Sequence, residues 1–311
     1  MKNKKLHELP MRDAFISTLQ KIATKDKKVI LLTNDQGAPA LDDYIKHLPN
    51  QFYNAGISEQ NIIGVAAGLS ILGFKPYVYS INSFIIYRTL EYIKIDLCSM
   101  KQPVTIVGVG SGYSYPQDGP THHSTEDISF TVPMANLDVF NPSDSLLTSE
   151  IINFTYRSKK PAFIRLDRQY CENLYFKKNN IKEGFRHIRK INKNRICIVT
   201  SGFFVARLFK LIEDQGLNCD LIDLYRLKNF HNQKLSKTLS RYKKIICIEE
   251  HAVNFGIGSI LSEIITDNQL NTKLLRLGLI EKNIFGYGSR DQLLNSNNLS
   301  DKKILDSINK F

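Results

Sequence analysis

The chain has 311 residues and a mass of 35.6 kDa, a size that favours two domains over one compact core. Hydrophobic residues make up 42% and charged residues 23%, a globular composition that excludes a disordered or fibrous protein. No apolar run approaches the roughly 18 residues of a membrane-spanning helix, so we expect no membrane partner. The N-terminus shows no secretory signal, and five scattered cysteines form no C-x-x-C pair. We therefore expect a cytoplasmic protein without disulfides or a zinc site.

The formal net charge of +12 is unevenly distributed. Residues 1–180 hold 20 basic and 17 acidic side chains, whereas residues 181–311 hold 22 and 13, much of the surplus lying between residues 182 and 195. A nucleic-acid-binding surface would need a basic stripe with exposed aromatics or a known reading motif. The sequence shows neither, so we interpret the surplus as solvated surface and linker and expect no nucleic-acid partner.

Short apolar runs alternate with amphipathic stretches, a pattern typical of wound α/β domains. In the first part we predict helices over 11–25, 61–72 and 83–100, and strands over 29–32, 75–81, 104–109, 137–140 and 162–166. Gly73 suits a left-handed helix cap. The polar segment 170–194 predicts a domain boundary near residue 180. Afterwards we predict strands at 196–200, 220–223 and 245–248, and helices at 203–215, 258–267 and 299–310.

The predicted fold class is therefore α/β, with two wound domains of mostly parallel sheets over residues 1–180 and 181–311. Three clusters in the first domain could carry chemistry. Glu59 begins an apolar helix directly after an extended segment, which is also where an acid is stabilised by the helix dipole. The second cluster has spacings of three and four, which predict a single helix face, and an aromatic core stripe is its simpler interpretation. Its members are Phe84, Tyr87, Arg88 and Glu91.

The third cluster is a polar loop over residues 118–127, in which His122 and His123 stand side by side after a Gly-Pro turn. Loops at strand ends carry function in wound α/β folds. Adjacent histidines there could bind a metal, shuttle protons or bind hydroxyls, although a surface loop with incidental histidines would look the same. No other His or Cys has ligand spacing to them, so we predict no metal ligands. Elsewhere, Gly256 and Gly258 lack the third glycine of a dinucleotide fingerprint.

Taken in order, the segments GISEQN, SFIIYRTLE, DGPTHHSTED and PAFIRLDRQ resemble the C-terminal half of the transketolase family. That half comprises a thiamine-diphosphate pyrimidine-binding domain and a C-terminal domain, and the resemblance covers residues 10–311. The segment IEEHAVNFGIGS is similar to the corresponding part of the C-terminal domain. The resemblance implies a transketolase, which transfers a two-carbon ketol unit from a ketose or ketose phosphate to an aldose with thiamine diphosphate as cofactor.

The resemblance also implies a role for each matching residue. Glu59 would hydrogen-bond N1′ of the aminopyrimidine and share a proton with it, favouring the imino tautomer whose 4′ nitrogen removes the C2 proton. Tyr87 would stack on the pyrimidine and Phe84 would form a second wall of its pocket. A third aromatic often found there is replaced by Leu90.

Four further residues match substrate-binding positions of the family. Asp118 and His122 would lie near the hydroxyls of the donor ketose, with His122 also near the reactive carbon. His123 completes a double histidine like that of split, two-gene transketolases. Arg168 would grip the sugar phosphate through charge-assisted hydrogen bonds. Gly110 stands where many full-length transketolases have a histidine, eight residues before the matching aspartate, so phosphate recognition could be weaker or the acceptor unphosphorylated.

The largest departure is the G-D-G…N motif with which the family holds the diphosphate and Mg²⁺, because this sequence lacks it. The resemblance therefore implies a partner, an N-terminal subunit that carries the diphosphate-binding domain, in a two-plus-two heterotetramer. Two enzyme alternatives remain: the beta subunit of a 2-oxo-acid dehydrogenase, and an activity like that of 1-deoxyxylulose-5-phosphate synthase. A catalytically silent partner subunit is the alternative from another class.

Overall fold

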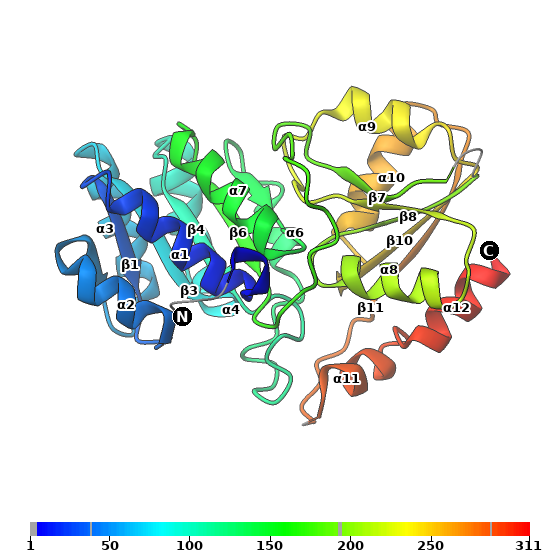
Figure 1. The fold of residues 1–311 in the computed structure, drawn as a ribbon, viewed down its shortest axis with the longest axis horizontal. Coiled ribbons are helices and arrows are strands. Elements are labelled where there is room, and N and C mark those ends of the chain that lie inside the picture. The colour runs from blue at the N-terminus through cyan, green and yellow to red at the C-terminus, as the bar shows by residue number, and fades with distance from the viewer. Residues whose placement is uncertain (1–4, 38, 192–194, 287) are drawn as a thin grey trace.

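The computed structural model describes residues 5–37, 39–191, 195–286 and 288–311, which form two α/β lobes joined near residues 167–185 (Figure 1). The N-terminal lobe holds six parallel strands in the order β2-β1-β3-β4-β6-β5. Their bounds are β1 Val29–Thr33, β2 Phe52–Asn54, β3 Lys75–Ile81, β4 Thr105–Val109, β5 Asp138–Phe140 and β6 Ala162–Leu166. The predicted α/β class and parallel first sheet are confirmed.

Helices cover both faces of this sheet because successive strand residues point to opposite sides. On one side Leu31, Tyr77 and Val107 pack in the core under α1 Met11–Ala23, α2 Pro39–His47 and α7 Ser145–Arg157. On the other, Leu32 and Val78 pack against α3 Glu59–Ile71. Strands buried on both faces explain the continuous apolar runs in the sequence. The left-handed cap predicted at Gly73 is confirmed by its φ of 83°.

The single helix predicted over residues 83–100 is wrong. The segment forms α4 Asn82–Tyr87, a short turn α5 Leu90–Tyr92 and a π-helix Ile93–Ser99. The break lies at Thr89, whose φ of −126° and ψ of 15° are not helical and whose hydroxyl bonds to the Ile85 carbonyl oxygen. A side chain that bonds back to the preceding turn bends a helix, so Glu91 is displaced from the face that Phe84 occupies.

The C-terminal lobe holds five strands in the order β11-β10-β8-β9-β7, of which only β7 runs antiparallel, to β9. Their bounds are β7 Arg186–Arg189, β8 Ile196–Thr200, β9 Asp220–Asp223, β10 Lys244–Ala252 and β11 Lys273–Leu279. The helices are α8 Phe204–Asp214, α9 Asn232–Leu239, α10 Ile257–Asp267, α11 Arg290–Ser296 and α12 Asp301–Lys310. The sequence patterns did not predict β7, β11, α9 and α11 in this lobe, nor β2, α2, α6 Asp127–Thr131 and α7 in the first lobe.

The two lobes are joined by backbone contacts as well as by the connecting segment. The Asn141 amide donates to the Tyr225 carbonyl and the Leu227 amide donates to the Val139 carbonyl, both at 2.8 Å. At the other end of the interface the Ala252 amide donates to the Thr125 carbonyl at 2.8 Å. The first sheet ends at Leu166 and the second begins with β7, and a boundary near residue 180 within this interval remains our proposal.

Candidate active site

Glu59 lies where the chain turns out of β2 into α3. Gly56, with a φ of 66°, makes the turn, and its carbonyl oxygen accepts a hydrogen bond from Asn34 Nδ2 at 2.9 Å. Glu59 is only 5% exposed, and its Oε1 accepts a hydrogen bond from Arg88 Nη1 at 2.8 Å. The start of a helix favours a negative charge. The turn thus holds a buried carboxylate at a helix N-terminus, in contact with one cation.

Arg88 and Phe84 connect Glu59 to the histidine loop. The Arg88 guanidinium lies over the Phe84 ring, 4.2 Å from its centroid. The same ring meets His122 edge to face, with centroids 4.8 Å apart. The Nδ1 atom of His122 lies 3.0 Å from the Thr121 hydroxyl oxygen. The sequence placed Arg88 only in an aromatic stripe, whereas in the structure it links the first cluster to the second.

Tyr87 points in another direction from Phe84. Its hydroxyl donates to Glu126 Oε2 at 2.9 Å and accepts the Glu126 amide proton at 3.2 Å, while its ring meets Phe130 edge to face. Burial raises the pKa of Tyr87, so the hydroxyl stays protonated at neutral pH. The side chain is therefore fixed against the segment 126–130, in which Glu126 is a contact that sequence analysis did not predict.

Tyr115 occupies the space that a side chain at Gly110 would need. Gly110 has a φ of 102°, and a Cβ atom there would lie 2.3 Å from Tyr115 Cε2. The Tyr115 ring lies 5.7 Å from the His122 ring and 4.8 Å below the Arg168 guanidinium. Its hydroxyl makes no hydrogen bond to any described residue. Sequence analysis did not single out Tyr115, although a glycine at the matching histidine position was a signal that another side chain fills the space.

The two adjacent histidines have different surroundings. Asp118 is exposed at the loop tip, and the amides of His122 and His123 both donate to the carbonyl oxygen of Gly119, a residue whose φ is 71°. His123 is 5% exposed and packs edge to face on Tyr113 with centroids 4.8 Å apart. Burial, together with the neighbouring His122, lowers the pKa of His123. Its Nε2 atom is buried without a hydrogen-bond partner among the described residues.

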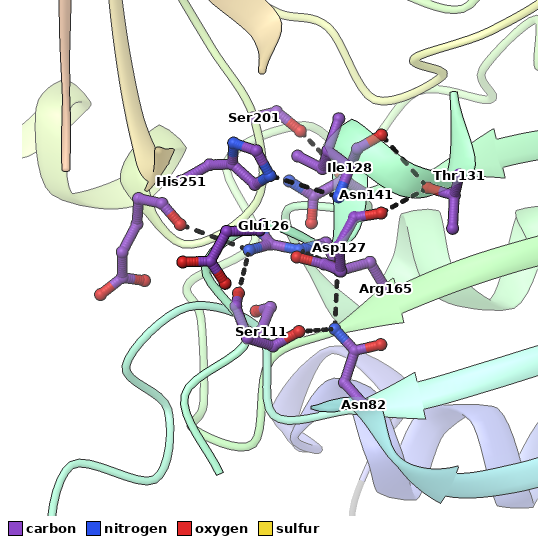
Figure 2. Close-up of polar contacts among 12 residues, drawn as sticks. Asn82, Ser111, Glu126, Asp127, Ile128, Thr131, Asn141, Arg165, Ser201 and His251 are labelled. Carbon is purple, nitrogen blue, oxygen red and sulfur yellow. Dashed lines mark hydrogen bonds and ion pairs between the residues drawn. The ribbon is translucent and has the colours of Figure 1, made fainter. Parts of the chain in front are cut away.

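A buried polar network holds the other end of this loop (Figure 2). Asp127 Oδ2 accepts hydrogen bonds from Arg165 Nε at 2.7 Å and from Asn82 Nδ2 at 2.8 Å. Arg165 also donates to the carbonyl oxygen of Glu250, which belongs to the C-terminal lobe. His251 Nε2 accepts the amide proton of Ile128 at 3.2 Å. The segment that follows the double histidine is therefore fixed by both lobes.

Arg290 makes a second buried connection between the lobes. It is 5% exposed and binds Asp167 through two hydrogen bonds, of 3.2 and 2.6 Å, and Glu250 through Nε at 2.8 Å. The Phe203 ring lies 3.5 Å below its guanidinium carbon. Asp167 directly precedes Arg168, so this helix α11 residue fixes the strand end that carries Arg168. Sequence analysis missed it.

The structure brings most of the predicted site residues into one row. Glu59, Arg88, Phe84, His122, Tyr115 and Arg168 follow one another in consecutive contact. Asp118 lies on the same loop, whereas Tyr87 and His123 point to the neighbouring side, toward Glu126 and Tyr113. Within the described residues no group of three or more His, Cys, Asp or Glu side chains could hold a metal ion, and no helix is long and apolar enough to cross a membrane.

Comparison with known families gives a match to each lobe. The family described as transketolase, pyrimidine binding domain, matches residues 7–172, and the family described as transketolase, C-terminal domain, matches residues 187–304. The chain belongs to the transketolase family. The resemblance seen in the sequence motifs is thereby confirmed, as is the predicted pair of domains of this fold class.

Relatives of similar length carry the same pair of domains. The chain is 27% identical to an apulose-4-phosphate transketolase subunit of Phocaeicola vulgatus, covering 90% of each chain. It is 28% identical to a transketolase C-terminal section of Methanocaldococcus jannaschii, covering 96% of this chain and 95% of that one. A solved structure described as a split gene transketolase, inactive beta4 tetramer, superimposes with a TM-score of 0.85 at 25% identity, covering 97% and 98% of the two chains. The transketolase of Campylobacter jejuni superimposes with a TM-score of 0.81, and there the chain spans 47% of the length.

Proposed function

We propose that this transketolase-family chain is the C-terminal subunit of a split, thiamine-diphosphate-dependent transketolase, transferring a two-carbon ketol unit from a ketose or ketose phosphate to an aldose. The observation that carries the proposal is the row of contacts from Glu59 to Arg168. In this row we assign Glu59 as the acid for the cofactor ring, His122 as the histidine for the substrate and Arg168 as the cation for a phosphate. Relatives of matching length, one named as a transketolase subunit and one as a C-terminal section, support a divided enzyme.

The side chains at the Glu59 end of the row fit the aminopyrimidine ring of thiamine diphosphate. Glu59 offers a buried carboxylate at the start of a helix, and Phe84, Tyr87 and Arg88 follow on the next helix. In this role Glu59 holds a proton at N1′ of the ring. Thiamine diphosphate supplies the carbon nucleophile when it is bound. For the diphosphate and Mg²⁺ we propose ligands on an N-terminal partner subunit, since the G-D-G…N motif is absent here.

The remaining residues are assigned to the substrates. His122 lies between Phe84 and Tyr115, where its ring can bind a hydroxyl and move a proton. Asp118 and Arg168 are exposed, and we assign them to a sugar hydroxyl and to a phosphate. Tyr115 joins them as a donor whose hydroxyl has no other described partner. His123 is too buried for direct substrate contact, and we revise its role to orienting the loop through Tyr113.

The alternatives differ in the reaction that they predict. A beta subunit of a 2-oxo-acid dehydrogenase would decarboxylate 2-oxo acids. A synthase-like enzyme would release CO₂ from such an acid and join the remaining acyl carbons to an aldehyde. The 1-deoxy-D-xylulose-5-phosphate synthase of Caldanaerobacter subterraneus is 26% identical, but the chain spans only 48% of its length. A catalytically silent subunit would not need the four residues that match cofactor- and substrate-binding positions of the family, which are Glu59, Asp118, His122 and Arg168. The match in length to split transketolases makes ketol transfer the better-supported function.

The proposal is tested by producing the chain together with a diphosphate-binding N-terminal transketolase subunit and assaying ketol transfer with thiamine diphosphate and Mg²⁺. We expect a two-plus-two complex that is active, and either subunit alone to be inactive. Full turnover by this chain alone would contradict the need for a partner. Decarboxylation of 2-oxo acids without ketol transfer would support the dehydrogenase or synthase alternatives instead.

The matched substitution is Glu59→Gln, which keeps the shape of the side chain and removes the acid. We expect kcat to fall by roughly 100-fold or more, the range that general acid–base groups contribute. Glu263→Gln, on the exposed face of α10, is the control and should leave kcat unchanged. Equal activity of the two variants, with intact complexes by size-exclusion chromatography, would remove Glu59 from the reaction.

A further inference from the structure

A cavity lies between the lobes, away from the row of contacts that forms the candidate active site. Its volume is about 1030 Å³, and none of the proposed cofactor or substrate residues lines it. Its walls are the C-terminal end of α7, the connecting segment 178–182 and the segment 226–231 that leads into α9. We call this the interlobe cavity. Its size and its place between two domains are those of a small-molecule site.

Basic side chains without an ionic partner surround the interlobe cavity. Five of them line it, all exposed: Arg157, Lys159, Lys160, Lys178 and Lys182. None of the five forms an ion pair with a described residue. Positive charge is therefore concentrated at one concave place, where the cations repel one another until an anion neutralises them.

The two carboxylates in the cavity wall leave this positive field largely uncompensated. Glu150 accepts hydrogen bonds from the amide and the side chain of Asn179, at 3.1 and 2.7 Å. Asp138 accepts from Arg226 Nη2 at 3.0 Å and from Asn229 Nδ2 at 2.6 Å. Each carboxylate is thus already held by protein donors, and together they offset two of the six formal positive charges of the lining.

Arg226 contributes a buried guanidinium to the wall of the interlobe cavity. The residue is 6% exposed, and its guanidinium lies 5.4 Å from the centroids of both Phe140 and Phe154. Asp138 is the one described residue to which its side chain donates, and its Nε atom is buried without a partner. The guanidinium therefore lies against a pair of rings that contact each other with centroids 5.9 Å apart, which restricts its movement, and it adds a fixed positive charge to the cavity wall.

We propose that the interlobe cavity binds a small organic anion that carries two or more phosphate groups. Five cations need more than one negative charge, and the apolar wall formed by Phe154, Ile181 and Phe230 suits a ligand with a carbon skeleton beside its phosphates. A nucleic acid fits less well, because Phe154 and Phe230 are partly buried against the cores and do not form the series of exposed rings on which successive bases stack. Bound between α7 and segment 226–231, the ligand would join the two lobes.

The test is calorimetric titration of the purified chain with ADP, inorganic triphosphate, inorganic phosphate and a 12-nucleotide single-stranded DNA. We expect ADP and triphosphate to bind and phosphate to bind much more weakly. The double variant Lys159→Glu, Lys160→Glu should weaken binding at least ~10-fold, because it replaces two attractions by two repulsions. The control Lys210→Glu, Lys302→Glu changes the net charge equally on α8 and α12, and should bind like the unchanged chain.

Arg168→Ala separates this site from the proposed active site, so the result does not depend on the proposed function. The variant should bind ADP and triphosphate normally. Loss of binding in Arg168→Ala would place the anion in the substrate site and overturn the proposal. Equal weakening by the control pair, no binding by the unchanged chain, or DNA binding that is tighter than ADP binding and lost in the Lys159→Glu, Lys160→Glu variant would also overturn it.

Discussion

Gly110 has no side chain, and the ring of Tyr115 occupies the space that a side chain there would fill. The ring fills the space above the glycine and lies between His122 and Arg168. A histidine could not be restored at residue 110 without displacing Tyr115, because even a Cβ atom would collide with the ring. In the proposed function the Tyr115 phenol therefore takes the place of a histidine side chain at residue 110.

Tyr115→Phe should raise KM for the sugar substrate by about fivefold, the worth of one uncharged hydrogen bond of about 1 kcal/mol. The ring contacts with His122 and Arg168 remain, so kcat and the melting temperature should hardly change. Steady-state kinetics of the two-subunit enzyme measures this. Tyr53→Phe is the control, since Tyr53 is 50% exposed on β2. An unchanged KM in Tyr115→Phe would exclude the hydroxyl from substrate binding.

Helix α11 contributes a single buried cation to the interface between the lobes. Arg290 pairs with both Asp167 and Glu250, which would otherwise be two buried carboxylates without a cation. Removing one member of a buried ion network leaves charges without a partner, which is more costly than the network itself is stabilising.

Arg290→Met should lower the free energy of unfolding by roughly 3–5 kcal/mol, as expected for a broken buried ion pair. Arg207 is the comparison, because it joins α8 to Asp291 and Asp301, which are 75% and 50% exposed. Arg207→Met should lose about 1 kcal/mol or less. Urea denaturation followed by circular dichroism measures both. Similar losses in the two variants would contradict a special role for α11.

Sequence patterns predicted the elements whose local signals are strong. The buried strands β1, β3 and β4 are continuous apolar runs, and α1 and α3 are long enough to show their period. Helix α11 has only seven residues, although its capping box between Ser289 and Gln292 was a usable signal. Strand β11 reads KLLRLGL, in which leucines alternate with other residues only from Leu275 to Leu279, a run too short to distinguish a strand from a loop.

The candidate site was predictable only in part, because only some of its residues belong to local sequence motifs. Motifs identified Glu59, His122 and Arg168 because these residues stand in recognisable local strings. Arg88, Tyr115 and Arg290 act through contacts across the fold. The partners Arg290 and Asp167, for example, are 123 residues apart in the chain. No local pattern reports such a pair until the strand order is known.

Over the whole molecule, buried titratable groups determine how the free energy of unfolding changes with pH. Burial lowers the pKa of His251, His123 and His187, so their neutral forms stabilise the fold above about pH 6.5. That stability is lost as the pH falls below 6.5, since the unfolded chain then binds more protons. Buried acids act in the opposite sense: burial raises the pKa of Glu249 to about 7 and that of Asp223 to about 6.

The variant His251→Gln measures the contribution of one of these histidines to the pH dependence of stability. Gln keeps an acceptor for the Ile128 amide and cannot be protonated in this range, so the variant should lose less stability between pH 7.5 and 5.5 than the unchanged chain. The difference should be up to about 1 kcal/mol, within the 1.36 kcal/mol that one pKa unit is worth. Urea denaturation at both pH values measures it. Parallel losses in the two proteins would show that His251 does not titrate there.

The Arg290 contacts also constrain how this pair of domains can be recombined. Asp167 belongs to the first lobe, while Glu250 and Arg290 belong to the second. A chimera that takes each lobe from a different relative would keep the fold of both lobes. It would nevertheless lose a charge of this triad whenever one parent lacks the charged residue at its position. Successful crossovers near residue 180 should therefore be those between parents that both carry Asp, Glu and Arg at positions 167, 250 and 290, so that each lobe supplies its share of the triad.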